Sequence, residues 1–240
     1  MKKDGRYDVS GLPEAQFEPG SNEQVLKNQL GIRSPREMDD AEARTLKMAI
    51  VGLVGNYSER RRFTAADIRA IHKSWLGEIY EWAGEYRQVN VSKGNFPFAA
   101  ANRVPSLMEE FGRDVLARHT PCNSKERAHI IRALAETHVE LVLIHPFREG
   151  NGRMARILST LMALQAGLPL LDFGLIAGER KATYFAAVQA GLGTRTTSQW
   201  NSYLRRLSSG ALRHLERHGL LTFNQGACDG FNWSTGFNGG

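Results

Sequence analysis

Residues 144–156 read Ile-His-Pro-Phe-Arg-Glu-Gly-Asn-Gly-Arg-Met-Ala-Arg, and apolar residues recur with helical spacing on both sides of this run. The helix predicted before it has the apolar residues Ile130, Ile131, Leu134, Val139, Val142 and Leu143. Proline disfavours helical geometry at the preceding residue, so this helix should end at His145. A second helix is predicted to begin around residues 151–153 and to end near Gly167. The run is therefore a glycine-containing loop between two helices.

The start of the second helix is suited to bind an anion. Backbone N–H groups at a helix N-terminus lack intrahelical partners and carry the positive end of the helix dipole. Gly150 and Gly152 allow the backbone to approach a phosphate closely and to adopt conformations that other residues avoid. Arg153 and Arg156 are three residues apart and are predicted to share a face in the first turn. Two guanidiniums beside such N–H groups fit a polyphosphate better than a single carboxylate.

The remaining polar residues of the loop add chemistry to this anion site. His145 has the side chain whose pKa best suits accepting a proton near neutral pH. Glu149 offers oxygen ligands suited to Mg²⁺ that also binds phosphate. The amide of Asn151 can donate to phosphate, and Phe147 is predicted to anchor the loop in the core. Each residue alone has an ordinary structural explanation, so the prediction depends on their combination within residues 145–156.

Two helices are predicted upstream from their capping residues. Ser34 is a candidate N-cap with Pro35 in the first turn and Glu37 three residues after the cap. That helix should bury one face and end near residues 55–56; the apolar residues of this face are Ala41, Leu46, Ala49, Ile50 and Leu53. Thr64 and Asp67 mark a second start, and its apolar face carries Ile68, Ile71, Trp75, Leu76 and Ile79.

Between these helices and the loop lies the one convincing strand signal. Residues 86–93 alternate with period two, and a turn at Lys93-Gly94-Asn95 leads to a second strand. Pro97 is incompatible with a central strand, so the second strand should lie at an edge. Two strands alone are marginally stable, so we expect the hairpin to pack on the helices.

Further helices are predicted at 104–116, at 178–191 and at 197–216, and a cap signature at 123–126 marks the start of the helix that ends at His145. The fold class is therefore mainly α with one short hairpin. Residues 1–24 are interpreted as an N-terminal arm, residues 25–218 as one domain, and residues 219–240, rich in Gly, Asn, Thr and Ser, as a disordered tail.

Composition narrows the class of protein. The 240 residues carry a net charge of +6, but the basic residues are scattered, so direct nucleic-acid binding is not favoured. The two cysteines, Cys122 and Cys228, lie far apart and form no metal-ligand spacing, so a disulfide framework is not expected and a cytoplasmic location is predicted. We find neither a signal-peptide pattern nor an apolar run long enough to span a membrane.

The segment 145–156 resembles, without departure, the motif His-x-Phe-x-(Asp/Glu)-Gly-Asn-Gly-Arg-x-x-Arg of the Fic domain family. The segments 71–72, 79–87 and 91–98 are similar to the helix and the hairpin flap that precede this motif in the family. The likeness extends over about residues 25–205. It implies the Fic fold, a helical bundle with a short β-hairpin flap (residues 86–99) over the active-site loop (residues 145–156).

The resemblance implies a protein adenylyltransferase, which moves AMP from ATP to a hydroxyl side chain of a target protein and releases pyrophosphate. His145 would deprotonate the hydroxyl, and Glu149 would hold Mg²⁺ between the α- and β-phosphates. The anion hole would consist of Gly150, Asn151 and Gly152, with Arg153 and Arg156 on the β- and γ-phosphates. The flap would dock an extended target segment by β-augmentation; its residues are Val91, Ser92, Lys93, Gly94, Asn95, Phe96 and Phe98. Tyr184 is a candidate for the adenine pocket.

Many relatives are inhibited by a helix carrying (Ser/Thr)-x-x-x-Glu-(Gly/Asn). This chain contains no complete copy: after Glu14, Glu78 and Glu110, which follow a serine at the required spacing, the last position is neither Gly nor Asn. The resemblance then implies a small separate antitoxin that supplies the helix, as in relatives that act as toxins on bacterial type II topoisomerases.

Two alternatives stay open at this point. Relatives of the same fold transfer a phosphoryl group or phosphocholine, and the phosphorylating type resembles His-x-Phe-x-Asp-Ala-Asn-Lys-Arg. Gly150 and Gly152 of this chain stand where that pattern has Ala and Lys, which favours AMP transfer. The other alternative is a non-enzymatic protein that binds nucleotide or nucleic acid, for which a base such as His145 would serve no purpose.

Overall fold

The computed structural model describes residues 11–56, 58–168 and 171 of the chain. The helices predicted at 178–191 and 197–216, the candidate adenine residue Tyr184 and the predicted tail 219–240 lie outside the described residues.

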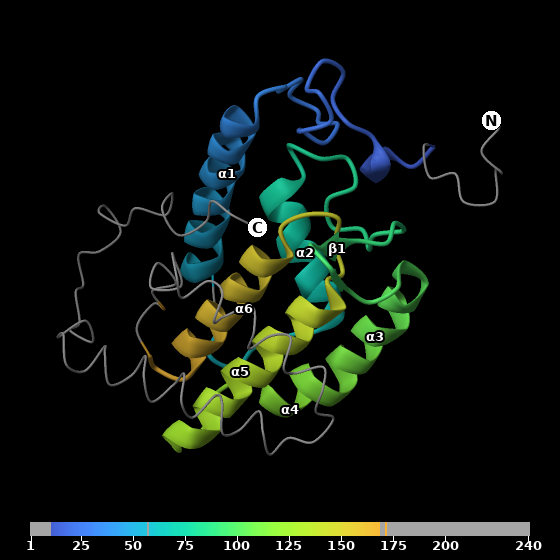
Figure 1. Cartoon of the computed structure of the whole chain (residues 1–240). Helices are drawn as coiled ribbons and strands as arrows, with labels where there is room; N and C mark the ends of the chain where they lie inside the picture. Colours follow the sequence, from blue (N-terminus) through green and yellow to red (C-terminus); the bar gives the residue numbers. More distant parts are fainter. Residues whose placement is uncertain (1–10, 57, 169–170, 172–240) are drawn as a thin grey trace.

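Four long helices form the frame of the described part: α1 (Pro35–Gly55), α2 (Ala65–Leu76), α5 (Arg127–Ile144) and α6 (Asn151–Gln165). A further continuous helical stretch consists of α3 (Val104–Glu110), the π-helical η4 (Phe111–Leu116) and α4 (Ala117–His119). Short 3₁₀ turns, η2 (Pro13–Ala15) and η3 (Ala101–Arg103), precede α1 and α3. Figure 1 shows α5 and α6 side by side, joined at one end by the loop of residues 145–150.

The first two helices begin where their capping residues predict. The Ser34 side chain accepts a hydrogen bond from the Glu37 N–H, and Pro35 opens α1. Thr64 and Asp67 form a reciprocal capping box at the start of α2. Both predicted starts are confirmed, because each depends only on local hydrogen bonds that the sequence specifies.

The predicted start of α5 is wrong by several residues. The cap signature at 123–126 opens no helix; the N-cap is Glu126, which makes no side-chain capping bond. The Ser124 hydroxyl instead accepts from the Glu126 N–H within the loop, so the polar residues stabilise a turn. The predicted end is confirmed, since α5 stops at Ile144 and His145 takes a left-handed conformation.

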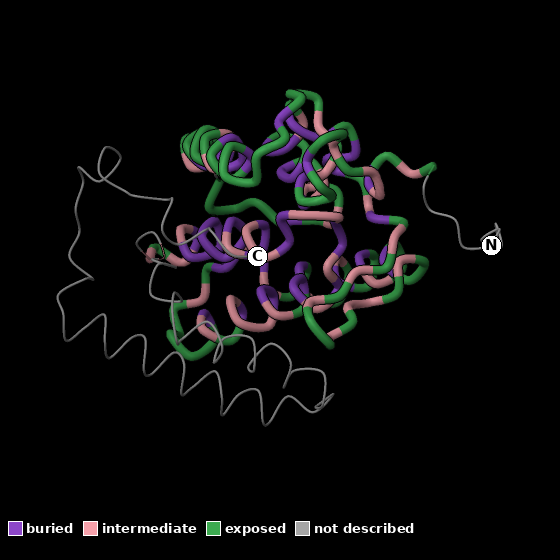
Figure 2. The backbone as a smooth tube through the Cα atoms, turned by 45° about the horizontal axis from the view of Figure 1, so that its top comes forward, coloured by how far each residue is buried: buried purple, intermediate pink, exposed green. Residues whose placement is uncertain are grey.

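The core surrounds α6, which packs against α5 on one side and α1 and α2 on the other. Its apolar residues are almost all buried: Met154, Ala155, Ile157, Leu158, Leu161, Met162 and Ala163. Figure 2 shows the buried residues gathered in the middle of the molecule and exposed residues along the outer side of α1. The loop of residues 145–150 is therefore attached to a deeply buried helix, which fixes its position. Within the described residues, none of the helices meets the length and hydropathy needed to cross a membrane.

The hairpin is present but shorter than the alternating pattern predicts. Strand β1 (Ser92–Lys93) pairs antiparallel with β2 (Phe96–Pro97), and Gly94 in the turn has φ +56°. The turn and the edge position of Pro97 agree with the prediction. Residues 87–89 do not join the ladder, because their N–H groups bond to the Pro146 carbonyl and to the Glu14 carboxylate. These residues tie the flap to the loop and to the N-terminal segment.

Candidate active site

The loop of residues 145–150 is closed by one amide side chain. Asn151, the first residue of α6, is buried; its Oδ1 accepts from the Phe147 N–H and its Nδ2 donates to the Phe147 carbonyl, both at 2.8 Å. Phe147 is completely buried, as predicted for the anchor of the loop. The Asn151 side chain therefore shapes the loop. The group that Asn151 offers to an anion at the start of α6 is its backbone N–H.

His145 caps α5 in a left-handed conformation with φ 52° and ψ 58°. Such a backbone costs roughly 1–2 kcal/mol for a residue with a side chain, so the surrounding contacts must hold it. The imidazole Nδ1 lies 3.1 Å from the Val142 carbonyl oxygen, which can only accept. Nδ1 therefore carries the hydrogen in the neutral ring, and Nε2 keeps its lone pair. Burial lowers the pKa of His145 to about 4.

His72 of α2 contacts the loop through Phe147 and Glu149, and it was not among the predicted site residues. Its Nδ1 accepts from the Gly84 N–H at 2.9 Å, so Nε2 donates to the Glu149 carbonyl at 3.1 Å. The His72 ring also stacks on Phe147 with 3.8 Å between ring centroids. Burial lowers the pKa of His72 to about 4, so the ring stays neutral and keeps this hydrogen-bond pattern.

Arg87 connects the flap to the end of α5 and was also missed. The side chain is 1% exposed, and its guanidinium donates to four backbone carbonyls. Two of these, Val89 and Ala99, belong to the flap, and two, Ile144 and His145, lie at the C-terminus of α5. The donor distance to the His145 carbonyl is 2.6 Å. A cation is favourable there because the carbonyls at a helix end carry partial negative charge.

Glu14 brings the N-terminal segment into the site. Its carboxylate is buried and accepts from the Gln88 N–H at 2.5 Å and the Val89 N–H at 3.1 Å. Its backbone carbonyl accepts from Arg148 of the loop at 2.9 Å. Residue 14 therefore contacts both the flap and the loop, although residues 1–24 read as an arm apart from the domain.

The N-terminus of α6 has the features of an anion nest. Gly150 has φ +79°, and an added Cβ would lie 2.8 Å from the Trp75 ring, so glycine is required there. The predicted unusual backbone is wrong for Gly152, which is helical; its missing side chain leaves the first turn bare. The Glu149 carboxylate, 38% exposed, accepts from the Gly150 N–H at 2.7 Å and so lies at the positive end of α6.

Arg153 and Arg156 contact different groups. The Arg153 guanidinium lies 2.5 Å from the carboxylate of Glu42 on α1 and 3.3 Å from that of Glu149, and it stacks over the Trp75 ring. Arg156 folds back along the first turn of α6, where its Nε donates to the Gly152 carbonyl at 3.3 Å. The second arginine therefore lies beside the bare turn at Gly152.

Glu42 is buried on the apolar face of α1 and holds Arg153 in place. Its second carboxylate oxygen accepts from the Tyr80 hydroxyl at 2.7 Å, and its backbone carbonyl accepts from the Trp75 indole at 3.0 Å. Burial raises the pKa of Glu42, and the nearby positive charge of Arg153 opposes this shift.

The flap covers His145 from the other side. The Phe98 ring stacks on the imidazole with 3.6 Å between centroids and 14° between planes. Phe96 contacts Phe98 edge to face. The turn and the alternate side chains of the hairpin are exposed (Ser92, Gly94, Asn95 and Pro97), whereas Val91 and Lys93 are half-buried. The predicted flap residues thus form one element beside the loop.

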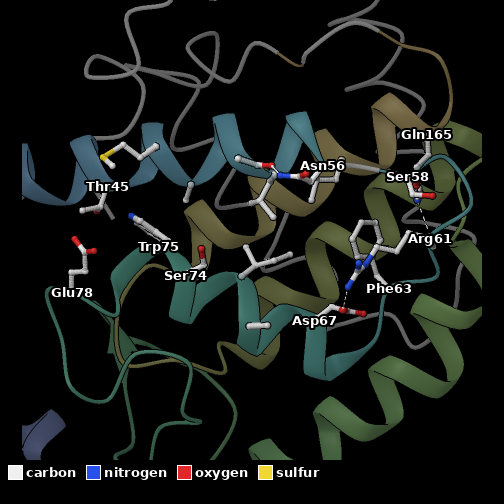
Figure 3. A pocket seen from close by; sticks show the side chains of 17 residues that line it. Thr45, Asn56, Ser58, Arg61, Phe63, Asp67, Ser74, Trp75, Glu78 and Gln165 are labelled. Atoms are coloured by element: carbon white, nitrogen blue, oxygen red, sulfur yellow. Dashed lines mark hydrogen bonds and ion pairs between the residues drawn. The ribbon is translucent and has the colours of Figure 1, made fainter.

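Two hollows in the described part of the chain bear on the site, and the smaller of them adjoins the loop. A hollow of about 170 Å³ is lined by Glu42, Tyr80, Glu149 and Arg153 together with residues before and within α1. A larger one of about 560 Å³ lies between α1 and α2, where Thr45, Ser74 and Glu78 are seen in Figure 3. Trp75 separates it from Gly150 and Arg153, and no residue of the loop lines it. We therefore place the site at the loop and not in the larger hollow.

Four residues that hold the loop in place were not predicted from the sequence, and the sequence offered a clue for two of them. Glu42 and His72 stand on the buried faces of α1 and α2, where a polar side chain must have a partner. That position was a usable signal. Arg87 and Glu14 gave none, because their partners are backbone groups far away in the sequence.

Comparison with known proteins gives consistent matches. The family model described as Fic/DOC family matches residues 62–163. The protein adenylyltransferase VbhT of Bartonella schoenbuchensis is 30% identical over 162 residues, which are 68% of this chain and 33% of VbhT. The probable protein adenylyltransferase Fic of Escherichia coli is 28% identical over 184 residues, 73% of this chain and 84% of that protein. This chain thus spans about a third of VbhT and most of the E. coli protein.

The fold also matches solved structures. The BepC protein of Bartonella tribocorum, solved with bound AMPPNP, superposes with a TM-score of 0.64 at 21% identity, covering 82% of this chain and 97% of that one. At this identity the likeness concerns the fold, and it confirms the predicted mainly α fold with a small hairpin.

Proposed function

Because this chain belongs to the Fic/DOC family, we propose that it is a protein adenylyltransferase that moves AMP from ATP to a hydroxyl side chain of a target protein. One observation carries the proposal: the Nδ1 of His145 is engaged by the Val142 carbonyl, which leaves Nε2 as a proton acceptor on the loop that leads into the α6 nest. The names of VbhT and of the E. coli relative support the same reaction. We also propose that residues 25–218 form the Fic domain that carries out this transfer.

The transfer consists of one displacement at phosphorus. The target hydroxyl gives its proton to Nε2 of His145 while its oxygen forms a bond to the α-phosphorus. The bond between that phosphorus and the α–β bridging oxygen breaks, and pyrophosphate leaves with the electron pair. A bound triphosphate would raise the low pKa of His145, because its negative charge favours the imidazolium that forms.

The nest stabilises the negative charge of the phosphates. The backbone N–H groups of Asn151, Gly152 and Arg153 lie in the first turn of α6, where no intrahelical acceptor exists. Arg156, beside Gly152, adds a guanidinium to this turn. Arg153 reaches the phosphates only if its pairing with Glu42 loosens or is shared. Catalysis of this kind consists of alignment and charge stabilisation.

A magnesium ion fits the donors that are present. Mg²⁺ in nucleotide sites commonly takes one or two protein carboxylates and completes its shell with phosphates and water. Glu149 supplies one partly exposed carboxylate at the nest. Within the described residues there is no group of three or more ligating side chains. We therefore assign Glu149 as the residue that would hold Mg²⁺, which when bound would neutralise phosphate charge.

The flap is proposed to dock the target. An extended segment of the target would pair with the hairpin edge near residues 91–98, and this would bring its hydroxyl to His145. Within the proposal the reaction takes place in the cytoplasm, where ATP is available. Tyr184 remains a proposed adenine contact outside the described residues.

The test uses the His145→Ala variant. The variant should lose transfer to proteins of a bacterial lysate, read as added AMP by mass spectrometry, while calorimetry shows unchanged ATP affinity. Unchanged labelling by the variant would refute the assigned base. If the chain binds ATP but never labels any protein, the non-enzymatic nucleotide-binding alternative replaces the proposal.

Regulation by a separate protein is part of the proposal. No complete inhibitory motif occurs in the sequence, and its nearest candidate, around Glu14, forms a 3₁₀ turn that contacts the flap. We propose that a small antitoxin supplies the inhibitory helix and that bacterial type II topoisomerases are candidate targets. The purified chain alone should then label itself with AMP. A chain that is inactive until an internal segment is deleted would contradict this idea.

A further inference from the structure

The Phe98 ring lies flat on the imidazole of His145. The centroids are 3.6 Å apart and the planes differ by 14°, so the two rings are in face-to-face contact. The imidazole is also held by a hydrogen bond from its Nδ1 to the Val142 carbonyl. A hydrogen bond fixes one atom of the ring and leaves rotation about that contact, whereas a stacked partner fixes the plane.

The position of Phe98 is itself fixed by the residues around it. Its backbone N–H donates to the Val91 carbonyl at 3.2 Å, across the hairpin. The next residue, Ala99, accepts from the Arg87 guanidinium, and the same guanidinium donates to the His145 carbonyl. Phe96 packs edge-on against the Phe98 ring with 5.4 Å between centroids. Arg87 thus holds the two backbones whose side chains stack.

From this geometry we infer that Phe98 is a positioning residue for His145: its ring sets the plane of the imidazole and keeps one face of it away from water. The inference rests on the proposed function, in which His145 is the base. It adds a role to the flap, because the hairpin proposed to dock the target also orients the group that activates the target hydroxyl.

The pKa of His145 depends on how deeply its ring is buried and on the charges around it. Charged groups face it from two elements: Arg87 and Lys93 belong to the flap, and Glu149 belongs to the loop. Burial has the largest effect on the pKa of His145, lowering it to about 4, and the Arg87 and Lys93 charges act in the same direction. The Val142 carbonyl and Glu149 oppose this. Since Phe98 covers a ring face, removing its ring should weaken the effect of burial.

The first experiment measures the imidazole directly in the full chain. The NMR titration of His145, assigned by its loss in His145→Ala, is followed in the wild type and in the variants Phe98→Ala, Phe98→Leu and Phe98→Tyr. We expect the pKa to rise by roughly one unit or more in Phe98→Ala, to rise less in Phe98→Leu, and to stay near the wild-type value in Phe98→Tyr, which keeps the ring. Phe17→Leu, a change of an exposed phenylalanine outside the flap, should leave the titration in place.

The second experiment measures transfer against pH. Phe98→Ala should lower kcat by roughly tenfold to a hundredfold, leave the KM for ATP unchanged, and move the acid limb of kcat/KM toward neutral pH together with the NMR pKa. Phe98→Tyr should restore kcat. Circular dichroism checks that each variant is folded, and Phe98→Leu serves if Phe98→Ala is not.

The two proposals fail separately. The NMR titration needs neither nucleotide nor target, so it tests the role of Phe98 even if the chain transfers no AMP. A His145 titration that is the same in wild type, Phe98→Ala and Phe98→Leu would overturn the inference. The same holds if Phe98→Tyr behaves like Phe98→Ala, because the ring would then have no role.

Discussion

The guanidinium of Arg153 in the Fic motif lies 2.5 Å from the buried carboxylate of Glu42, a residue of α1 that precedes the family match at 62–163. The side chains are 13% and 5% exposed, so water screens this pair little. Helix α1 thereby fixes one end of the motif, and the Fic motif in this chain depends on a residue 111 positions before it in the sequence.

Removing the Glu42 charge should destabilise the fold. Glu42→Gln can still accept from Tyr80, but it leaves the Arg153 cation partly unpaired in a buried place. We expect the free energy of unfolding in urea to fall by about 3 kcal/mol. Asp40→Asn, an exposed change on the same helix, should remain within about 0.5 kcal/mol of the wild type. Equal stabilities of the two variants would contradict a structural role for the pair.

Alanine substitutions at the two glycines of the nest should have different effects on stability and on activity. Gly150→Ala places a methyl group 2.8 Å from the Trp75 ring at a positive φ, so it should destabilise the protein by more than about 2 kcal/mol. Gly152→Ala meets only Arg156, at 3.8 Å, and a helical alanine is stabilising by up to about 1 kcal/mol. Its methyl group would stand in the bare turn where phosphate approaches.

Thermal or urea unfolding, followed by an AMP-transfer assay, distinguishes the two effects. Gly152→Ala should fold at least as well as wild type and yet lose most of its transfer activity. Full activity in Gly152→Ala would show that no phosphate group approaches the first turn of α6.

The sequence was sufficient for the parts that depend on local rules. The caps at Ser34 and Thr64, the end of α5 before Pro146 and the start of α6 at Asn151 all depend on residues that are close together in the sequence. The loop 145–156 was identified for the same reason, since its residues are consecutive.

The parts that failed depend on distant partners. The strand predicted from residue 86 is not formed because Glu14 and Pro146 take its hydrogen bonds. The cap predicted at residues 123–126 became a turn through Ser124. Periodicity carries no information about which remote group will satisfy a backbone N–H, so Glu14 and Arg87 could not be assigned a place beforehand.

Acid should destabilise the protein through its buried histidines. The pKa values of His72, His138 and His145 are each lowered to about 4, chiefly by burial, from an ordinary value near 6.5. Between these values the unfolded chain binds more protons than the folded one, so stability is complete above pH 6.5 and is lost as the pH falls toward 4. Each histidine contributes a slope of at most about 1.4 kcal/mol per pH unit.

A non-titrating variant isolates one of these contributions. His138 bonds to the Ser159 hydroxyl at 3.1 Å within the core, and His138→Gln retains a polar group there. Urea unfolding between pH 6.5 and 5 should show a shallower pH dependence in this variant, by up to one proton. An identical slope would mean that His138 is not neutral in the folded state.

The N-terminal segment should control the flap. Glu14→Ala removes the acceptor of the Gln88 and Val89 N–H groups, so hydrogen exchange at these two amides should accelerate by at least tenfold, the equivalent of about 1.4 kcal/mol. Transfer to the target should fall while ATP affinity stays the same. Glu18→Ala, which disturbs bonds to Asn28 within the segment and none to the flap, is the matched control. Slow exchange at 88 and 89 in Glu14→Ala would refute this role.

The most direct measurement of the central claim is a paired label transfer. The chain is incubated with a target lysate and ATP labelled either at the α-phosphate or at the γ-phosphate, with His145→Ala in parallel. Adenylyl transfer predicts labelled protein from the α-label alone, lost in His145→Ala. Protein labelled from the γ-phosphate, or labelling that persists without His145, would contradict the account.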